Sequence, residues 1–74
     1  MTLLYSKPGV PMLVDEITWS PGVKRRLEDM GFIKGTPVCV IRSDGFGAIV
    51  VEIKGSKLLL GRGMAQKIKV KEAA

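Results

Sequence analysis

Five stretches of the chain carry the hydrophobic pattern of short β-strands. Apolar residues either alternate with other residues or follow one another without interruption over 10–15, 38–41, 49–54, 57–60 and 67–71. Alternation with a period of two is typical of a strand that buries one face. The Gly55-Ser56 pair, between two of these stretches, predicts a two-residue hairpin turn of type II′. The pattern therefore indicates a mainly β protein.

A single helix is predicted between the first two strands. Ser20 is a suitable N-cap, because its hydroxyl can accept a hydrogen bond from an amide of the first turn, and Pro21 suits the first helical position. An apolar stripe follows at helical spacing: Val23, Leu27 and Met30. Gly31 is expected to end the helix, with Phe32 folding back onto Leu27. A helix of about two to three turns is not stable alone, so we expect it to cover a sheet.

Together these elements predict a small barrel of about five strands, because closing the sheet removes most of its open edges. Pro11 indicates that the first strand lies at an edge or starts late. A single helical turn is predicted before the last strand, where Gly61 and Gly63 disfavour a longer helix. Lysines alternate along the last strand, as expected of an edge strand that is protected from pairing with other strands.

The chain of 74 residues is expected to form one domain, 1–74, in which 1–7 and 72–74 fray. A single cysteine cannot form an internal disulfide, which fits a reducing compartment. No apolar run approaches the length of a membrane span, and the first nine residues lack the apolar core of a signal peptide. We therefore expect a cytoplasmic protein.

The charge balance is basic, with 12 lysines and arginines against 7 acidic residues. A net charge of +5 suggests an anionic partner, namely nucleic acid, a lipid surface or an acidic protein, although it also serves solubility. The one dense cluster is Lys24, Arg25 and Arg26, which we expect on the helix face away from the apolar stripe. The alternative is a solvated face with pairs at a spacing of four, Lys24–Glu28 and Arg25–Asp29.

The side chains that enzymes use are scarce. The chain has no histidine, and Cys39 lies within a strand pattern, where a small buried hydrophobe is the expected role. The acidic residues that are neighbours in sequence point apart on a strand or helix. No glycine-rich nucleotide motif and no histidine–carboxylate metal set is present. We expect no catalytic residues, no metal ligands and no cofactor.

Two aromatic residues are candidate contacts. Trp19, just before the helix, is expected either to pack on the barrel wall or to contact a partner, and Phe46, in a glycine-flanked loop, either fills the barrel or contacts a partner. The predicted strands themselves carry no ring. Barrels that bind single-stranded nucleic acid use stacking aromatics on their strands, so nucleic acid is the less favoured partner.

Four motifs occur in an order that is typical of one family: Pro8-Gly9 before the first strand, RLEDMGF at 26–32, GTPV at 35–38, and Ala65 followed by IKV at 68–70. On these motifs residues 8–70 resemble FeoA, the small cytosolic accessory protein of bacterial ferrous-iron uptake. The resemblance implies an SH3-like β-barrel and a family-level link to transition metal ions. It also implies association with the cytosolic G-domain of a FeoB-type membrane transporter.

The expected function is therefore a non-enzymatic accessory or regulatory protein of ferrous-iron uptake that acts through protein–protein interaction. We expect Lys24, Arg25 and Arg26 to contribute to partner binding, with Trp19 and Phe46 as apolar contacts. Two alternatives stay open. One is a basic barrel that binds single-stranded nucleic acid. The other is a metal-responsive domain, because the same barrel is similar to the C-terminal domain of iron-dependent repressors.

Overall fold

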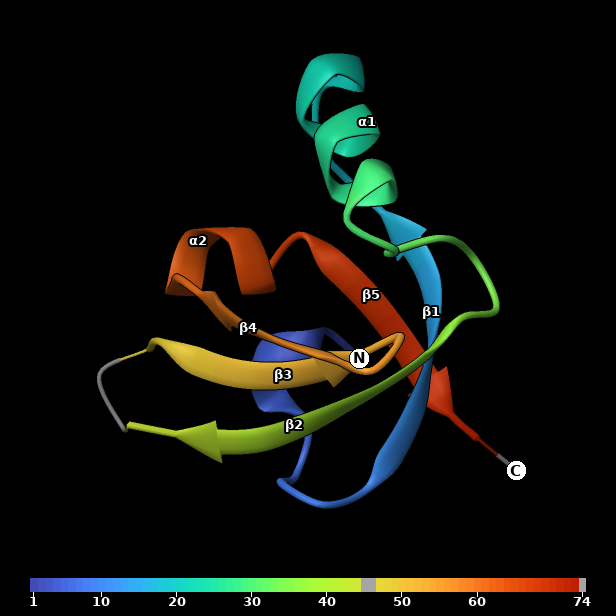
Figure 1. Ribbon diagram of the computed structural model, residues 1–74. Helices are drawn as coiled ribbons and strands as arrows, with labels where there is room; N and C mark the ends of the chain where they lie inside the picture. The colour runs from blue at the N-terminus through green and yellow to red at the C-terminus, as the bar shows by residue number, and fades with distance from the viewer. Residues whose placement is uncertain (45–46, 74) are drawn as a thin grey trace.

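The computed structural model describes residues 1–44 and 47–73. Within these residues the strands form one antiparallel sheet, in the order β4-β3-β2-β1-β5 (Figure 1). The elements in chain order are η1 (Leu3–Tyr5), β1 (Pro11–Ile17), α1 (Pro21–Asp29), β2 (Pro37–Ser43), β3 (Ile49–Ile53), β4 (Ser56–Leu60), α2 (Arg62–Ala65) and β5 (Ile68–Glu72). The predicted mainly β fold, with one helix after the first strand and one helical turn before the last, is confirmed.

The sheet curls around one hydrophobic core. The inward side chains of every strand are buried, as are those of four described apolar residues outside the strands, Leu3, Leu27, Phe32 and Ala65. Register shifts between Val14 and Glu16 and between Val40 and Arg42 mark irregularities that bend and twist the sheet locally. β1 is a central strand that starts at Pro11, so the late start predicted from this proline is correct.

The barrel is open between β4 and β5. These strands stand at the two ends of the sheet order, so each pairs with one other strand only, and the outer side of β5 is bridged by the N-terminal segment through Thr2 and Lys69. The segment α2 links them, and η1 contacts both α2 and β5. The expectation that closure removes the open edges is therefore met only in part, because a sheet edge remains along β4.

The N-terminal segment is part of the core, so the prediction that residues 1–7 fray is wrong. Leu3 is fully buried, and the amide of Val70 donates to the carbonyl of Met1 at 2.9 Å. At the other end, β5 continues to Glu72, and the amide of Ala73 donates to the carbonyl of Pro11 at 3.4 Å. A chain this short needs the apolar side chains near its start to complete its core.

The helix α1 begins and ends where the sequence predicts, with one difference at its start. Ser20 is the N-cap, but its hydroxyl makes no capping hydrogen bond, while its carbonyl accepts from the amide of Lys24 at 2.9 Å. At the C-terminus the amide of Phe32 donates to Leu27 and that of Gly31 to Glu28, both at 3.0 Å. With φ of 107° at Gly31, this is the Schellman ending expected from the sequence.

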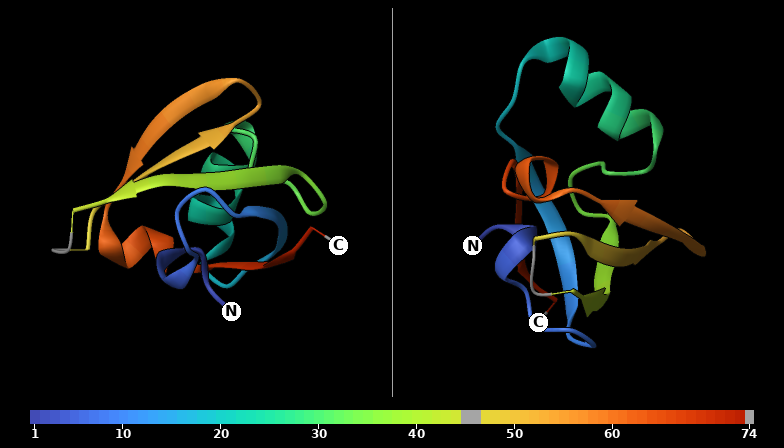
Figure 2. Two further views of the ribbon diagram at one scale, coloured as in Figure 1. Left: turned by 90° about the horizontal axis from the view of Figure 1, so that it is seen from below. Right: turned by 90° about the vertical axis from the view of Figure 1, so that its left-hand side faces the viewer.

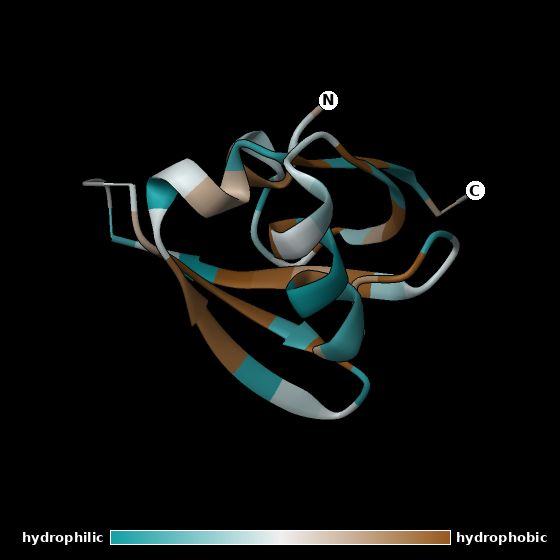
Figure 3. Cartoon of the chain, turned by 90° about the horizontal axis from the view of Figure 1, so that it is seen from above, coloured by the Kyte–Doolittle hydropathy of each residue, from teal (hydrophilic) through white to brown (hydrophobic). Residues whose placement is uncertain are grey.

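The helix does not lie over a face of the sheet. Figures 1 and 2 show α1 projecting from one end of the barrel. Of the predicted apolar stripe only Leu27 is fully buried, whereas Val23 is half-buried and Met30 is 43% exposed. Phe32, which follows the helix, is fully buried. Seen from above and coloured by hydropathy, α1 is mostly polar against largely apolar strands (Figure 3).

The hairpin between β3 and β4 turns one residue earlier than predicted. Ile53 pairs with Ser56, so the two loop residues are Lys54 and Gly55, with φ of 49° and 78°. Two positive φ angles define a type I′ turn, whose twist matches that of the flanking strands, rather than the predicted type II′ turn at Gly55-Ser56. The pattern missed this turn because lysine rarely adopts a positive φ.

The burial of Leu3 predicts that the N-terminal segment stabilises the domain. Leu3→Ala should lower the free energy of unfolding by about 2–5 kcal/mol, the usual cost of truncating a buried leucine. Tyr5→Ala, on the same short helix but exposed, is the matched control and should change it by less than about 1 kcal/mol. Urea denaturation followed by Trp19 fluorescence measures both. Equal, small effects would contradict the packing of this segment.

Gly47 is confined by α2. Its φ is 107°, and a Cβ built there would lie 2.7 Å from the Cβ of Arg62. Gly47→Ala should therefore destabilise the domain by about 1–3 kcal/mol, from backbone strain and from the displacement of α2. Gly63→Ala is the control, since the space around Gly63 is open within 4 Å and its φ is not in the left-handed region. This change should stabilise by about 0.5–1 kcal/mol through helix propensity. The same denaturation measurement tests whether the two changes have opposite signs.

Candidate interaction surface

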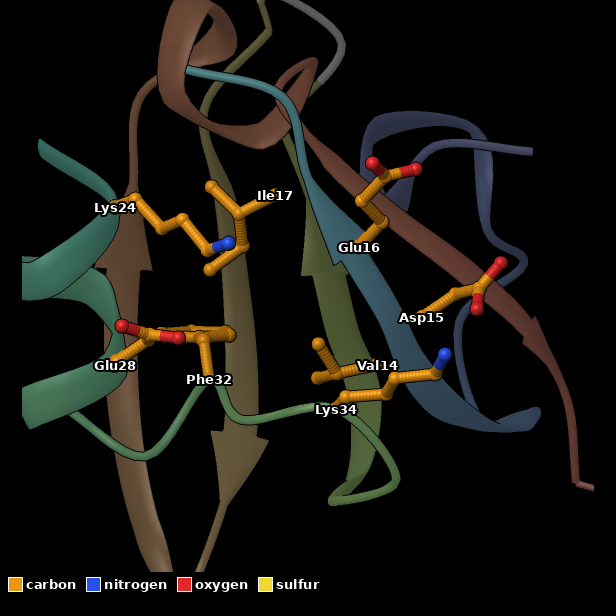
Figure 4. Close-up of a pocket in the computed structure, with 8 residues that line it drawn as sticks. All are labelled: Val14, Asp15, Glu16, Ile17, Lys24, Glu28, Phe32 and Lys34. Atoms are coloured by element: carbon orange, nitrogen blue, oxygen red, sulfur yellow. The ribbon is translucent and has the colours of Figure 1, made fainter. Parts of the chain in front are cut away.

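A groove of about 350 Å³ runs between α1 and β1 (Figure 4). Its apolar lining is Val14, Ile17 and Phe32, side chains that are already buried in the core. Its charged lining combines three carboxylates and two amines: Asp15, Glu16, Glu28, Lys24 and Lys34. In Figure 4, Lys24 and Glu28 extend from α1 toward Ile17 and Phe32, whereas the carboxylates of Asp15 and Glu16 point away from the helix.

The charged side chains of this groove form no ion pair with one another in the described part of the chain. Its charges are of both signs, and the residues that the structure describes contain no cluster of three His, Cys, Asp or Glu side chains suited to a metal ion. The only pair of groove charges on α1 is Lys24 and Glu28, four residues apart, and no ion pair joins them among the described residues. Their charged groups are therefore available to a partner.

The structure divides the basic cluster predicted from the sequence. Arg25 and Arg26 are exposed on α1 and lie outside the groove lining, while Lys24 is exposed but lines the groove. The prediction that all three share the face away from the apolar stripe is therefore wrong for Lys24. The alternative pair between Arg25 and Asp29 is not formed among the described residues. Both guanidinium groups are thus presented to solvent on a helix that projects from the barrel.

The sequence predicts that Trp19 either packs on the barrel wall or contacts a partner, and the structure shows it partly exposed. Its side chain is 39% exposed, and the Lys67 amine lies 5.9 Å from the ring centroid. A cation at this distance over an exposed ring contributes about 0.5–1 kcal/mol. The amide of the adjacent Thr18 donates to the carbonyl of Lys67 at 2.8 Å, which holds the end of β1 against the start of β5. Phe46, the other predicted aromatic contact, lies outside the described residues.

Cys39 is half-buried on β2, and its thiol lies 3.6 Å from the carbonyl oxygen of Val40. It lines a second, shallower groove of about 330 Å³ together with two prolines, Pro11 and Pro37. No titratable base lies in hydrogen-bond contact with the thiol in the part of the chain that the structure describes.

Among the described residues, no helix combines the length and the apolar character that crossing a bilayer requires.

Comparison with known families identifies the chain. The FeoA domain family matches residues 1–72, almost the whole sequence. The chain belongs to the FeoA family. The match is longer than the 8–70 that the sequence motifs cover, and it includes the buried N-terminal segment.

Individual relatives agree with this assignment. A curated protein of Methanocaldococcus jannaschii, provisionally named Fe(2+) transport protein A, is 37% identical over 71 residues, 96% of this chain and 85% of its own. The solution structure of FeoA from Chlorobium tepidum superposes with a TM-score of 0.88 at 33% identity, covering all of this chain and 71% of that one. The chain is therefore related to proteins of ferrous-iron transport, as the resemblance implied.

The SH3-like fold is confirmed by a third relative. FeoA of Stenotrophomonas maltophilia, solved in complex with zinc and described as a prokaryotic SH3 domain protein, superposes with a TM-score of 0.85 over 96% of this chain and 89% of that one. At 22% identity this likeness shows the fold alone.

Sequence reasoning found the residues of α1 but missed the groove beside it. The spacing of Lys24 and Glu28 indicates that they share a helix face, yet it does not show that this face looks across at β1. That relation depends on how α1 is placed against β1, which only the tertiary structure shows (Figure 4).

Proposed function

We propose that this chain is a non-enzymatic accessory protein of ferrous-iron uptake that binds the cytosolic G-domain of a FeoB-type transporter through α1. Membership of the FeoA family supports the role in iron uptake. The association with the transporter is inferred from the resemblance to FeoA. Such an interaction places the protein in the cytoplasm, on the transporter's inner side.

The observation that carries the choice of surface is the position of α1. The helix projects from the barrel, buries Leu27 alone, and presents Arg25 and Arg26 to solvent (Figure 1). A positive surface on a small domain favours an acidic partner and raises the rate of association with it. The adjoining groove adds the charges of Lys24 and Glu28, which can set the orientation of the partner.

The nucleic-acid alternative is less favoured by the positions of the aromatic rings. The described rings are Tyr5, Trp19 and Phe32, and none belongs to a strand. Phe32 is also fully buried, so the described faces of the sheet offer no platform on which bases could stack.

Charge reversal on α1 tests the proposal. The double variant Arg25→Glu/Arg26→Glu should weaken binding to the G-domain of the transporter encoded in the same genome by about tenfold or more, because it replaces attraction by repulsion. Isothermal titration calorimetry at low and high salt measures the effect, and the loss should shrink as salt screens the charges.

The matched control is Lys69→Glu/Lys71→Glu, which makes the same change in net charge on exposed residues of β5. This control should retain most of the affinity. Equal losses of affinity in both variants would show that binding depends on the net charge of the chain rather than on α1. No loss of affinity in either variant would show that α1 is not part of the interface. Single-stranded RNA replaces the G-domain in a parallel titration, and tighter binding to RNA would favour the alternative function.

A further inference from the structure

The two edges of the sheet are built differently. Along β5, the lysines at 69 and 71 are exposed, and the N-terminal segment covers part of the outer side through a bridge between Thr2 and Lys69. Charged side chains and a covering segment are means by which proteins protect an edge from other strands. The edge formed by β4 has the sequence SKLLL, with one lysine and no proline, and its register with β3 is regular over all five residues. The chain protects one edge and leaves the other able to pair.

The backbone of β4 presents hydrogen-bonding groups outward at two positions. A two-residue hairpin loop is closed by a hydrogen-bonded pair, here Ile53 and Ser56, and such pairs alternate along an antiparallel ladder. Residues 56, 58 and 60 therefore direct their amides and carbonyls to β3, while Lys57 and Leu59 direct theirs away from it. None of the loop, cap and bridge hydrogen bonds of the described residues uses the backbone of Lys57 or Leu59.

These outward groups are symmetric about Leu58, so a second copy of the same strand can satisfy them with an identical set of groups. We propose that β4 pairs antiparallel with β4 of a second copy of this chain, with a twofold axis at Leu58. In this register Lys57 stands opposite Leu59 of the second copy, and Leu59 opposite its Lys57. Each of these pairs can exchange two backbone hydrogen bonds, so the outward groups of both copies are satisfied by identical surfaces, as a twofold interface requires.

The side chains suit this register. Leu59 is 73% exposed, the most exposed large hydrophobic residue of the described chain, and it stands opposite Val50 of β3. Across the axis it would lie beside the stem of Lys57, whose charge is opposite Glu52 of its own chain. The half-buried Leu58 would meet its own counterpart. Figure 3 shows the apolar character of β4 toward its C-terminal end, at the margin of the sheet.

The register also avoids unfavourable contacts. Lys57 does not face Lys57, so no like charges stand directly opposite each other across the axis. The interface is a pair of five-residue strands, which is small by the standard of stable complexes, so we expect a weak dimer that forms only at high protein concentration.

Removal of one outward amide tests the pairing. Lys57→Pro deletes a backbone N–H that points away from β3, at an edge position where proline is tolerated. Lys57→Thr removes the same charge but keeps the amide. In sedimentation equilibrium up to about millimolar concentration, the unmodified chain and Lys57→Thr should approach the mass of a dimer, whereas Lys57→Pro should remain a monomer. A dimer that forms equally well in Lys57→Pro would overturn the proposal, as would a monomer at every concentration.

Amide hydrogen exchange in the unmodified chain gives a second measurement that does not depend on the folding of a variant. The amides of Lys57 and Leu59 should exchange quickly at low concentration and become protected as the concentration rises. Those of Leu58 and Leu60 point to β3 and should be protected throughout. Self-association without protection at 57 and 59 would place the dimer interface elsewhere and refute the pairing through β4.

Discussion

The structure depends on the need of a short chain to fill one hydrophobic core. A domain of 74 residues buries only roughly 60% of the surface that its unfolded chain exposes, so few apolar side chains can be spared for other purposes. The core accordingly takes side chains from all five strands and draws in Leu3 from the N-terminus and Phe32 from the turn after the helix. Packing these residues leaves little apolar surface for α1 to cover.

The position of α1 follows from this distribution. The Schellman ending places Phe32 beneath the base of the helix, where it completes one end of the core. The helix packs against the core through the buried Leu27 and the partly buried Val23, and most of its other residues are exposed. A short helix with so few contacts is a costly addition to a small domain unless it has a further role. Its exposed arginines and the groove between it and β1 are the features on which the proposed partner binding is based.

The open edge of the barrel is a second consequence of the small size. With β4 and β5 at the ends of the sheet, the outer side of β5 is partly covered by the N-terminal segment and carries lysines, whereas β4 has neither a covering segment among the described residues nor more than one lysine. The surface of α1 and the edge of β4 are separate features, one charged and one formed by backbone and leucines. Both features use groups that the core does not need, because the described core is built from other, buried side chains.

The sequence by itself determined the five strands and α1, though not the N-terminal turn η1 or the exact hairpin turn, because strand alternation, the glycine at position 31 and the proline at position 21 act over a few neighbouring residues. It also showed the family, through motifs that lie at the ends of these elements. Only the tertiary structure decided that Leu3 is buried, that Met30 is not, that Lys24 faces β1 and that the edge of β4 stays open. These outcomes depend on which distant segments compete for the same core, and a local pattern contains no information about that competition.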